Sequence, residues 1–235
     1  MAIDAILFDK DGTLIDFQAS WGGWAADMLA ELTHDRPELT QPLADRLGVD
    51  LIGREILPGS IMIAGTPLDI CQEIVATGGW TDVDELTRWM VDTSKDVAAV
   101  ALTGLHKSLQ QLRDMGLILG VATNDAIAPT QRQLNGLDIA HHFDFVAGFD
   151  SGHGAKPDPG PCLAFAHAIA VEPAQCAMVG DSLHDLHAGR AAGMLCVGVS
   201  SGPATTKELS CAADIVLPSI VDLPDWLRAT AARSN

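Results

Sequence analysis

The sequence predicts an α/β fold: an open, Rossmann-like parallel sheet with an inserted, mainly helical domain. From residue 117 onward, short apolar runs rich in β-branched residues alternate with helical stretches. Runs of this kind suit strands that are buried on both faces of a parallel sheet. A similar run opens the chain, and a block of helical periodicity separates it from the others. We therefore expect a core of residues 1–16 and 101–235, and an inserted helical domain of residues 17–100.

Composition favours a cytoplasmic protein with a small-molecule partner. The chain has 235 residues and is 48% hydrophobic, which is enough for a sizeable core. Its net charge of −17 disfavours nucleic acids and anionic membranes as partners. The five cysteines lack metal-binding spacing and are typical of reduced thiols. We find no signal peptide and no apolar run long enough to span a bilayer, and the sequence does not predict an oligomeric state.

The inserted domain shows three stretches of helical periodicity. The first contains Trp21, Trp24 and Leu32, and the others cover residues 67–76 and 82–102. Between them, residues 55–65 (EILPGSIMIAG) predict two short extended pieces around a Pro-Gly pair, forming a hairpin or an irregular loop.

The core is expected to follow a strand-helix alternation after the insertion. Residues 103–116 predict a helix that ends at Gly116, and residues 182–192 predict another that ends at Gly193. The expected strands cover residues 117–124, 143–150, 176–181, 195–202 and 214–219.

Polar residues follow several of these strands, where ligands collect in an open parallel sheet. The set consists of Asp9, Asp11, Thr123, Asn124, Lys156, Asp181 and Asp185. Each residue has a structural alternative, because Asp and Asn favour turns and cap helices, and a lysine before proline can lie on the surface. That alternative must be invoked separately for each strand, whereas one site explains all of them. We therefore favour one site.

The residue types in this set predict a magnesium-dependent phosphate site. Asp9, Asp11 and Asp181 would repel one another unless a cation neutralised them, and their oxygen ligands suit Mg²⁺ better than zinc. His184 and His187 show no zinc-binding pattern and are interpreted as surface or packing residues.

A lysine, a threonine hydroxyl and free amides near Gly12 and Asn124 would complete a site for a phosphoryl group. One carboxylate can then attack phosphorus while a second acts as general acid and base. In extended backbone, Asp9 and Asp11 would project to the same side and Lys10 would point away.

The ordered motifs DKDGT, ATN, KPDP and GDSLHD resemble the haloacid dehalogenase superfamily, and specifically its phosphatases with a helical cap inserted after the first motif. The resemblance implies that Asp9 is the nucleophile, Asp11 the general acid and base, and Asp181 a magnesium ligand together with Asp9 and the Asp11 carbonyl. It further implies that Thr123, Lys156 and the Asn124 backbone bind the phosphoryl group, and that Asp185 orients Lys156 or a metal-bound water.

Within the family, the chain resembles the phosphoglycolate phosphatase-like subgroup. Asp11 is missing from the dehalogenase branch, so its presence implies phosphate chemistry, and Lys10 replaces an apolar residue of many members. Segment 55–65 matches no specificity motif. Candidate cap contacts to substrate are Trp21, Trp24, Arg54 and Ser60, although Arg54 can equally be a surface residue and the tryptophans part of the cap interior.

The sequence and the resemblance together predict a Mg²⁺-dependent phosphatase acting on a small-molecule phosphate monoester, phosphoglycolate-like or a sugar phosphate, through an aspartyl-phosphate intermediate. A phosphomutase of the same fold is the first alternative. A non-enzymatic phospho-acceptor module is the second, but it needs only about half this length and would not explain the insertion.

Overall fold

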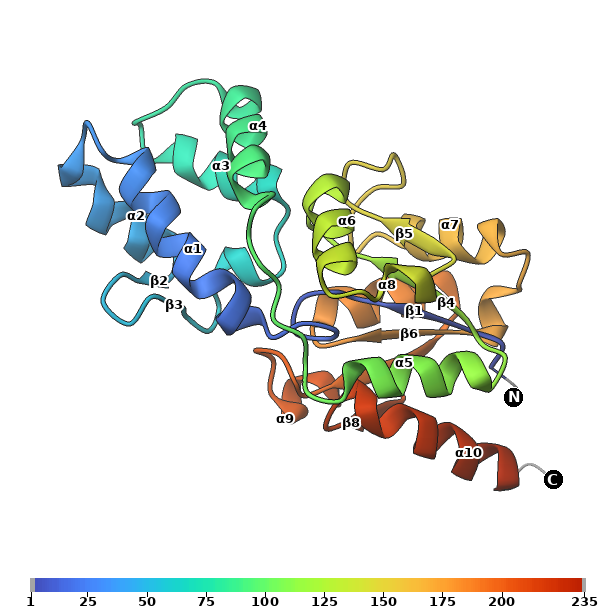
Figure 1. The fold of residues 1–235 in the computed structure, drawn as a ribbon. Coiled ribbons are helices and arrows are strands. Elements are labelled where there is room, and N and C mark those ends of the chain that lie inside the picture. The colour runs from blue at the N-terminus through green and yellow to red at the C-terminus, as the bar shows by residue number, and fades with distance from the viewer. Residues whose placement is uncertain (1–2, 234–235) are drawn as a thin grey trace.

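The computed structural model describes residues 3–233 and contains a six-stranded parallel sheet in the order β5-β4-β1-β6-β7-β8 (Figure 1). This sheet confirms the predicted fold class. The strands are β1 (Ala5–Phe8), β4 (Ile118–Ala122), β5 (Phe145–Ala147), β6 (Cys176–Gly180), β7 (Leu195–Val199) and β8 (Ile215–Leu217). The last five lie within the ranges expected for them, and β1 forms from the apolar run that opens the chain. Phe8 pairs with Val121 of β4 and Val179 of β6, so the carboxyl ends of these three strands are level.

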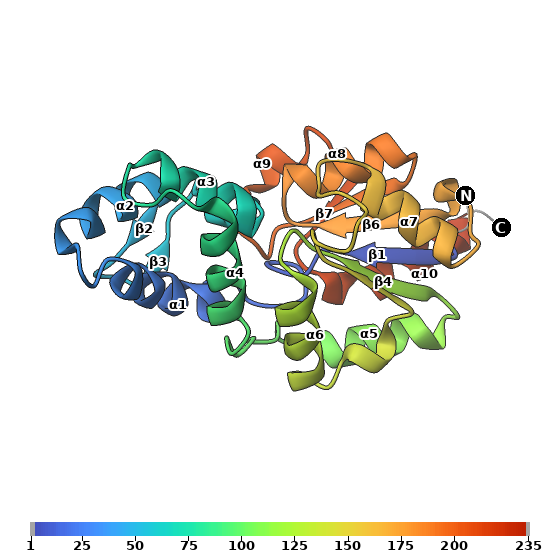
Figure 2. The ribbon, with the colours of Figure 1, turned by 90° about the horizontal axis from the view of Figure 1, so that it is seen from above.

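Helices cover both faces of the sheet (Figure 2). One face carries α5 (Leu105–Asp114), α6 (Ile127–Gly136) and α10 (Leu223–Arg233), which pack on a cluster containing Ile6 and Phe8. The other carries α7 (Gly160–Ala168) and α8 (Leu183–Ala192), which pack on a cluster containing Ala5 and Leu7. The alternation along β1 therefore feeds both layers, as a central strand requires. The short α9 (Thr206–Leu209) lies against β7.

The inserted segment forms a separate lobe beside the sheet (Figure 1). Its helices are α1 (Phe17–Leu32), α2 (Thr40–Leu47), α3 (Pro67–Ala76) and α4 (Val83–Ser94), and its hairpin is β2 (Val49–Asp50) with β3 (Glu55–Ile56). The buried residues of this lobe, such as Leu29, Leu43 and Ile74, form one hydrophobic cluster of their own. Short 3₁₀ turns cover Pro37–Leu39, Ile61–Ile63, Ala140–His142, Pro173–Gln175 and Ile220–Asp222.

Two expectations for the inserted segment were wrong in detail. The helix expected over residues 82–102 ends at Ser94, because the following residues return to the core, where Ala101 bridges to Ile15. The hairpin turns at residues 51–54 rather than at the Pro-Gly pair, and residues 61–63 form a 3₁₀ turn that the Ser60 hydroxyl caps by accepting from the Met62 N–H. The α2 helix was not expected.

No helix among the described residues is long and apolar enough to cross a bilayer.

Candidate active site

A cavity lies between the carboxyl ends of the central strands and the inserted segment. Its floor is polar and comes from the core, with Asp9, Asp11, Thr123, Lys156, Asp181 and Asp185 as the chief residues. Its walls come from the inserted segment and are mainly apolar, with Phe17, Trp21, Trp24, Met62, Ile63 and Met90 as the chief residues. The floor thus unites residues that are up to 176 positions apart in the chain, from Asp9 to Asp185.

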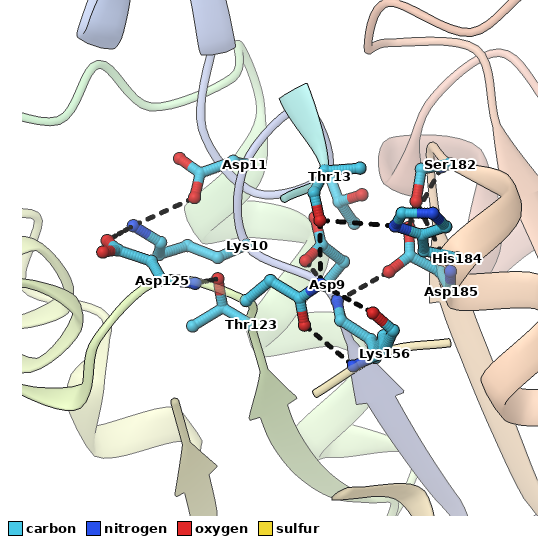
Figure 3. A network of polar contacts seen from close by, with 12 residues as sticks. Asp9, Lys10, Asp11, Thr13, Thr123, Asp125, Lys156, Ser182, His184 and Asp185 are labelled. Atoms are coloured by element: carbon cyan, nitrogen blue, oxygen red, sulfur yellow. Dashed lines mark hydrogen bonds and ion pairs between the residues drawn. The ribbon is translucent and has the colours of Figure 1, made fainter. Parts of the chain in front are cut away.

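Asp9 follows β1 directly and is buried at the centre of the floor (Figure 3). Its N–H donates to the Val179 carbonyl of β6, at 2.8 Å. Its carboxylate accepts a hydrogen bond from the Lys156 ammonium, at 2.6 Å. Burial raises the pKa of Asp9 to about 7, against the opposing effect of Lys156. Asp9 is therefore a carboxylate whose charged form needs further positive charge nearby.

Lys156 lies between Asp9 and Asp185, with its Nζ atom 2.6 Å from an oxygen of each. Burial lowers the pKa of this lysine, but the two carboxylates outweigh burial and the pKa is raised overall. Asp185 is itself held at the start of α8, where its second oxygen accepts from the Ser182 N–H and hydroxyl. This capping box fixes the carboxylate that in turn fixes the lysine.

Asp181 follows β6 and is enclosed by backbone that leaves no room for side chains. A Cβ atom on Gly12, whose φ is +82°, would lie 2.4 Å from an Asp181 carboxylate oxygen, and one on Gly202 would lie 1.8 Å away. Thr13 donates its hydroxyl to the same carboxylate at 3.0 Å. Burial raises the pKa of Asp181 well above its ordinary value. Gly12 is therefore required for close approach to a floor carboxylate as well as for its turn.

The floor suits a divalent cation. One carboxylate oxygen from each of Asp9, Asp181 and Asp185 lies within 4.8 Å of the others, and all three residues are buried. Lys156 is the one ammonium that contacts this cluster, so the three carboxylates exceed the positive charge available among the described residues. An excess of buried carboxylate oxygens is the ligand chemistry that Mg²⁺ prefers. Asp11 lies outside this carboxylate cluster, and its carbonyl as a ligand stays a prediction.

Asp11 lines the cavity but faces a different set of partners from Asp9. Its carboxylate accepts from the Trp21 indole N–H and lies 3.1 Å from the Lys10 ammonium, and Figure 3 shows it turned toward Lys10. Asp9 and Asp11 both line the cavity, as the expected same-side projection requires, although β1 ends at Phe8 and the following backbone turns.

Lys10 is buried beside the cavity and does not line it. Its buried ammonium contacts Asp125 at 2.8 Å and also donates to the Gln133 side chain. The motif alone gave no sign of Asp125 and Gln133 as partners, because they lie more than 110 residues away in sequence.

Two residues that follow β4, Thr123 and Asn124, contribute to the site. Thr123 lies in the floor, and its hydroxyl accepts from the Asp125 N–H. The Asn124 side chain makes two hydrogen bonds with the Lys156 backbone, donating at 2.8 Å and accepting at 2.9 Å. It also donates to the Ala64 carbonyl of the inserted segment at 2.8 Å. Asn124 therefore ties the Lys156 loop to the segment above the floor.

The four candidate contacts from the inserted segment divide into two groups. Trp21 and Trp24 lie in the walls and pack edge to face, with ring centroids 5.3 Å apart. Arg54 lies outside the cavity and pairs with Asp27 at 2.7 Å on the surface, and Ser60 is used as a cap and as a donor to the Leu47 carbonyl. The structure therefore does not place Arg54 or Ser60 in the cavity.

His184, interpreted from the sequence as a surface or packing residue, lies in the floor. Its Nδ1 is 3.3 Å from the Ala64 carbonyl. Its position one residue before Asp185 on α8 was the available signal. His187 is exposed, as the sequence interpretation expected.

Comparison with known proteins agrees with this arrangement. A family model described as haloacid dehalogenase-like hydrolase matches residues 3–193. A phosphoglycolate phosphatase of Rhodospirillum rubrum is 30% identical over 235 residues, covering 95% of this chain and 90% of that protein.

Two crystal structures share the fold. A predicted phosphoglycolate phosphatase from Haemophilus somnus has a TM-score of 0.73 at 19% identity, covering 95% of this chain and 97% of that one. The β-phosphoglucomutase of Clostridium difficile has a TM-score of 0.64 at 20% identity, covering 99% and 98%. The family model and the Rhodospirillum rubrum relative confirm the resemblance of the four motifs, and the chain belongs to the haloacid dehalogenase-like hydrolase family.

Proposed function

We propose that this protein is a Mg²⁺-dependent phosphatase that hydrolyses a small-molecule phosphate monoester through an aspartyl-phosphate on Asp9. One observation carries the proposal: Asp9 is buried at the end of the central strand, hydrogen-bonded to Lys156, within a carboxylate cluster that faces a cavity. The phosphoglycolate phosphatases among the relatives support the same reaction class.

In this proposal, Asp9 attacks phosphorus with one carboxylate oxygen as the bond to the leaving oxygen breaks. Lys156 and Thr123 bind equatorial oxygens of the phosphoryl group. Asp11 gives a proton to the leaving alkoxide, and then takes one from the water that releases inorganic phosphate and restores Asp9. Bound Mg²⁺, held by Asp9, Asp181 and the Asp11 carbonyl, would neutralise phosphoryl charge.

We further propose that residues 17–100 act as a cap domain that excludes water during the reaction. The walls of the cavity come from this segment, and Asn124 joins it to the Lys156 loop.

The unpaired state of the five cysteines supports a cytoplasmic location.

Two other functions are separable from this one. A phosphomutase would return the phosphoryl group to a sugar, and the likeness to a β-phosphoglucomutase supports the shared fold alone. A phospho-acceptor module would hold a long-lived aspartyl-phosphate without turnover. Release of inorganic phosphate, measured beside isomerisation of a hexose phosphate and the lifetime of the phosphoenzyme, distinguishes the three.

The proposal is tested by replacing the nucleophile. We expect Asp9→Asn to lower kcat for phosphate release by roughly a thousandfold or more, because the amide cannot form the phosphoenzyme. Asp4→Asn is the matched control, since Asp4 is exposed at the opposite end of the same strand and its variant should keep wild-type kcat. EDTA should abolish activity and Mg²⁺ should restore it. Near-normal turnover by Asp9→Asn with a native circular dichroism spectrum would contradict the mechanism.

A further inference from the structure

We propose that the substrate is a phosphate monoester of an uncharged, largely apolar alcohol, aromatic or branched aliphatic, rather than an ester with a second anionic group. This inference rests on the proposed phosphatase function and concerns the part of the cavity that would hold the leaving group. The walls of the cavity carry it, since they face the space above the phosphoryl site.

The walls offer hydrophobic and aromatic surface from several elements of the inserted segment. Trp21 and Trp24 come from α1, Met62 and Ile63 from the 3₁₀ turn after the hairpin, and Met90 from α4. Trp24 and Ile63 are only half-buried, so apolar area is left for a ligand to cover. Covering such area is favourable for an apolar group, and pockets of this composition bind apolar ligands.

The cationic side chains of the inserted segment are all engaged elsewhere. Three make ion pairs with acidic residues of the same segment, one stacks on Trp80, and one bonds to a backbone carbonyl of its own helix. The three ion-paired residues are Arg46, Arg54 and Lys95. Arg36 is the residue that stacks on Trp80, and Arg88 is the one that bonds to a backbone carbonyl. None of the five lines the cavity. The walls therefore provide no partner for an anionic leaving group.

The floor cannot supply that partner either. Among the side chains that the structure describes, Lys156 is the one lysine or arginine that lines the cavity, and Asp9 and Asp185 already hold it. A carboxylate next to the phosphoryl group would instead meet other carboxylates, uncharged polar side chains and apolar surface. An anion buried without a partner is strongly disfavoured. His184 is the one other floor residue that can carry positive charge, and the experiment below tests it directly.

A polyhydroxylated leaving group is also poorly served. Each hydroxyl removed from water needs a hydrogen-bond partner. The polar side chains of the walls are those of Trp21, Trp24 and Ser94. Trp21 already donates to Asp11, and the Ser94 hydroxyl donates to the Val91 carbonyl. Among the wall side chains, only the Trp24 indole N–H is left to pair with a hydroxyl of a sugar phosphate.

The test compares four alkyl esters on the wild-type protein with Mg²⁺: benzyl phosphate, isobutyl phosphate, glycerol 1-phosphate and phosphoglycolate. We expect kcat/KM for the benzyl and isobutyl esters to exceed that for the other two by about tenfold or more. Acetyl phosphate has a small acyl group and a good leaving group, so its hydrolysis measures the activity of the floor without a contribution from the walls. If the protein hydrolyses none of the five compounds, the proposed phosphatase function is overturned. Hydrolysis with phosphoglycolate or glycerol 1-phosphate preferred would overturn only the present inference.

Two matched variants locate the effect in the walls. Ile63→Arg puts a cation into the cavity, and we expect it to lower kcat/KM for benzyl phosphate and to raise it for phosphoglycolate, so that their ratio falls at least tenfold. Ile52→Arg makes the same change at a residue that is 97% exposed on the hairpin turn, and its ratio should equal that of the wild type. An unchanged ratio in a folded Ile63→Arg protein would contradict the inference.

His184→Gln addresses the remaining cationic group. If His184 pairs with a substrate carboxylate, phosphoglycolate turnover falls selectively in this variant, and the inference is wrong. We expect instead that His184→Gln leaves the ratio between benzyl phosphate and phosphoglycolate within about threefold of the wild-type value. The wild-type comparison stands even if a variant fails to fold.

Discussion

Lys10 is a fully buried lysine whose ammonium lies between two carboxylates, those of Asp11 and Asp125. Burial lowers the pKa of the lysine, but Asp11 and Asp125 outweigh it and raise the pKa overall. The ammonium also lies 5.0 Å from the centre of the Trp21 ring, whose indole N–H donates to Asp11. At the scale of one residue, Lys10 thus connects the proposed general acid and base to the core beneath it.

We expect Lys10→Met to destabilise the protein by about 3–5 kcal/mol, because it leaves Asp125 and Asp11 without their buried counter-charge. Urea unfolding measures the loss. Asp125→Asn in the same chain should recover part of it, which a double-mutant cycle resolves. Lys107→Met, at an exposed position of α5, should change the free energy of unfolding by less than about 0.5 kcal/mol. Equal losses at the two lysines would show that the buried network contributes nothing.

At this scale, the sequence predicted residues in short motifs better than their partners. Asp9, Lys156 and Asp181 were found because turn-forming and charged residues follow apolar strands, and parallel strands bring their ends together. Asp125, Gln133 and His184 were not, because each gains its role from a contact with a distant part of the chain. Arg54 was a candidate on charge alone, and its contact with Asp27 could not be read from spacing.

The elements of the core were more predictable than those of the inserted segment. A central strand such as β6 is buried at every position and reads as an unbroken apolar run. The pieces of the hairpin are two residues long, too short for any period to show. The α2 helix is also hard to recognise in the sequence, because it buries only Leu43, Ala44 and Leu47 and its apolar stripe is narrow. Short elements that depend on their neighbours escape a reading based on local patterns.

The inserted segment has its own hydrophobic cluster, so damage there should stay local. We expect Leu29→Ala, at a fully buried position of α1, to cost about 2–5 kcal/mol and to speed amide hydrogen exchange across residues 17–94. Exchange in β1 and β6 should stay slow. Leu109→Ala, at a fully buried position of α5, should speed exchange in the sheet. Uniform loss of protection in both variants would mean that the two lobes unfold as one unit.

Across the whole molecule, negative charge is concentrated where the proposed metal binds. The chain has 31 acidic residues and a net charge of −17, and three of these residues form the floor cluster, with carboxylate oxygens within 4.8 Å of one another. An unfolded aspartate titrates near 3.8, whereas burial raises the pKa of Asp9 in the folded protein to about 7. Between these values the folded state binds more protons than the unfolded state. The free energy of unfolding contributed by Asp9 therefore falls as pH rises through this window in metal-free protein.

Mg²⁺ should reverse this loss. We expect about 5 mM Mg²⁺ to raise the midpoint of thermal unfolding more at pH 8 than at pH 5.5, because protons compete for the carboxylates at the lower pH. Differential scanning fluorimetry measures the shift. Asp181→Asn should reduce it at pH 8, and Asp4→Asn should not. A shift of equal size at both pH values would argue against the carboxylate cluster as the binding site.

The two connections between the lobes lie side by side. Ile15 bridges to Ala101, the Asp16 N–H donates to the Val100 carbonyl, and the Leu102 N–H donates to the Leu14 carbonyl. The polypeptide therefore leaves the core and returns to it at adjacent positions. A recombination event that replaces the whole segment between these positions need not disturb the strand pairing of the six-stranded sheet. Ancestral chains could thus have acquired new substrate preferences as whole modules, while the reacting aspartate and its lysine were inherited unchanged.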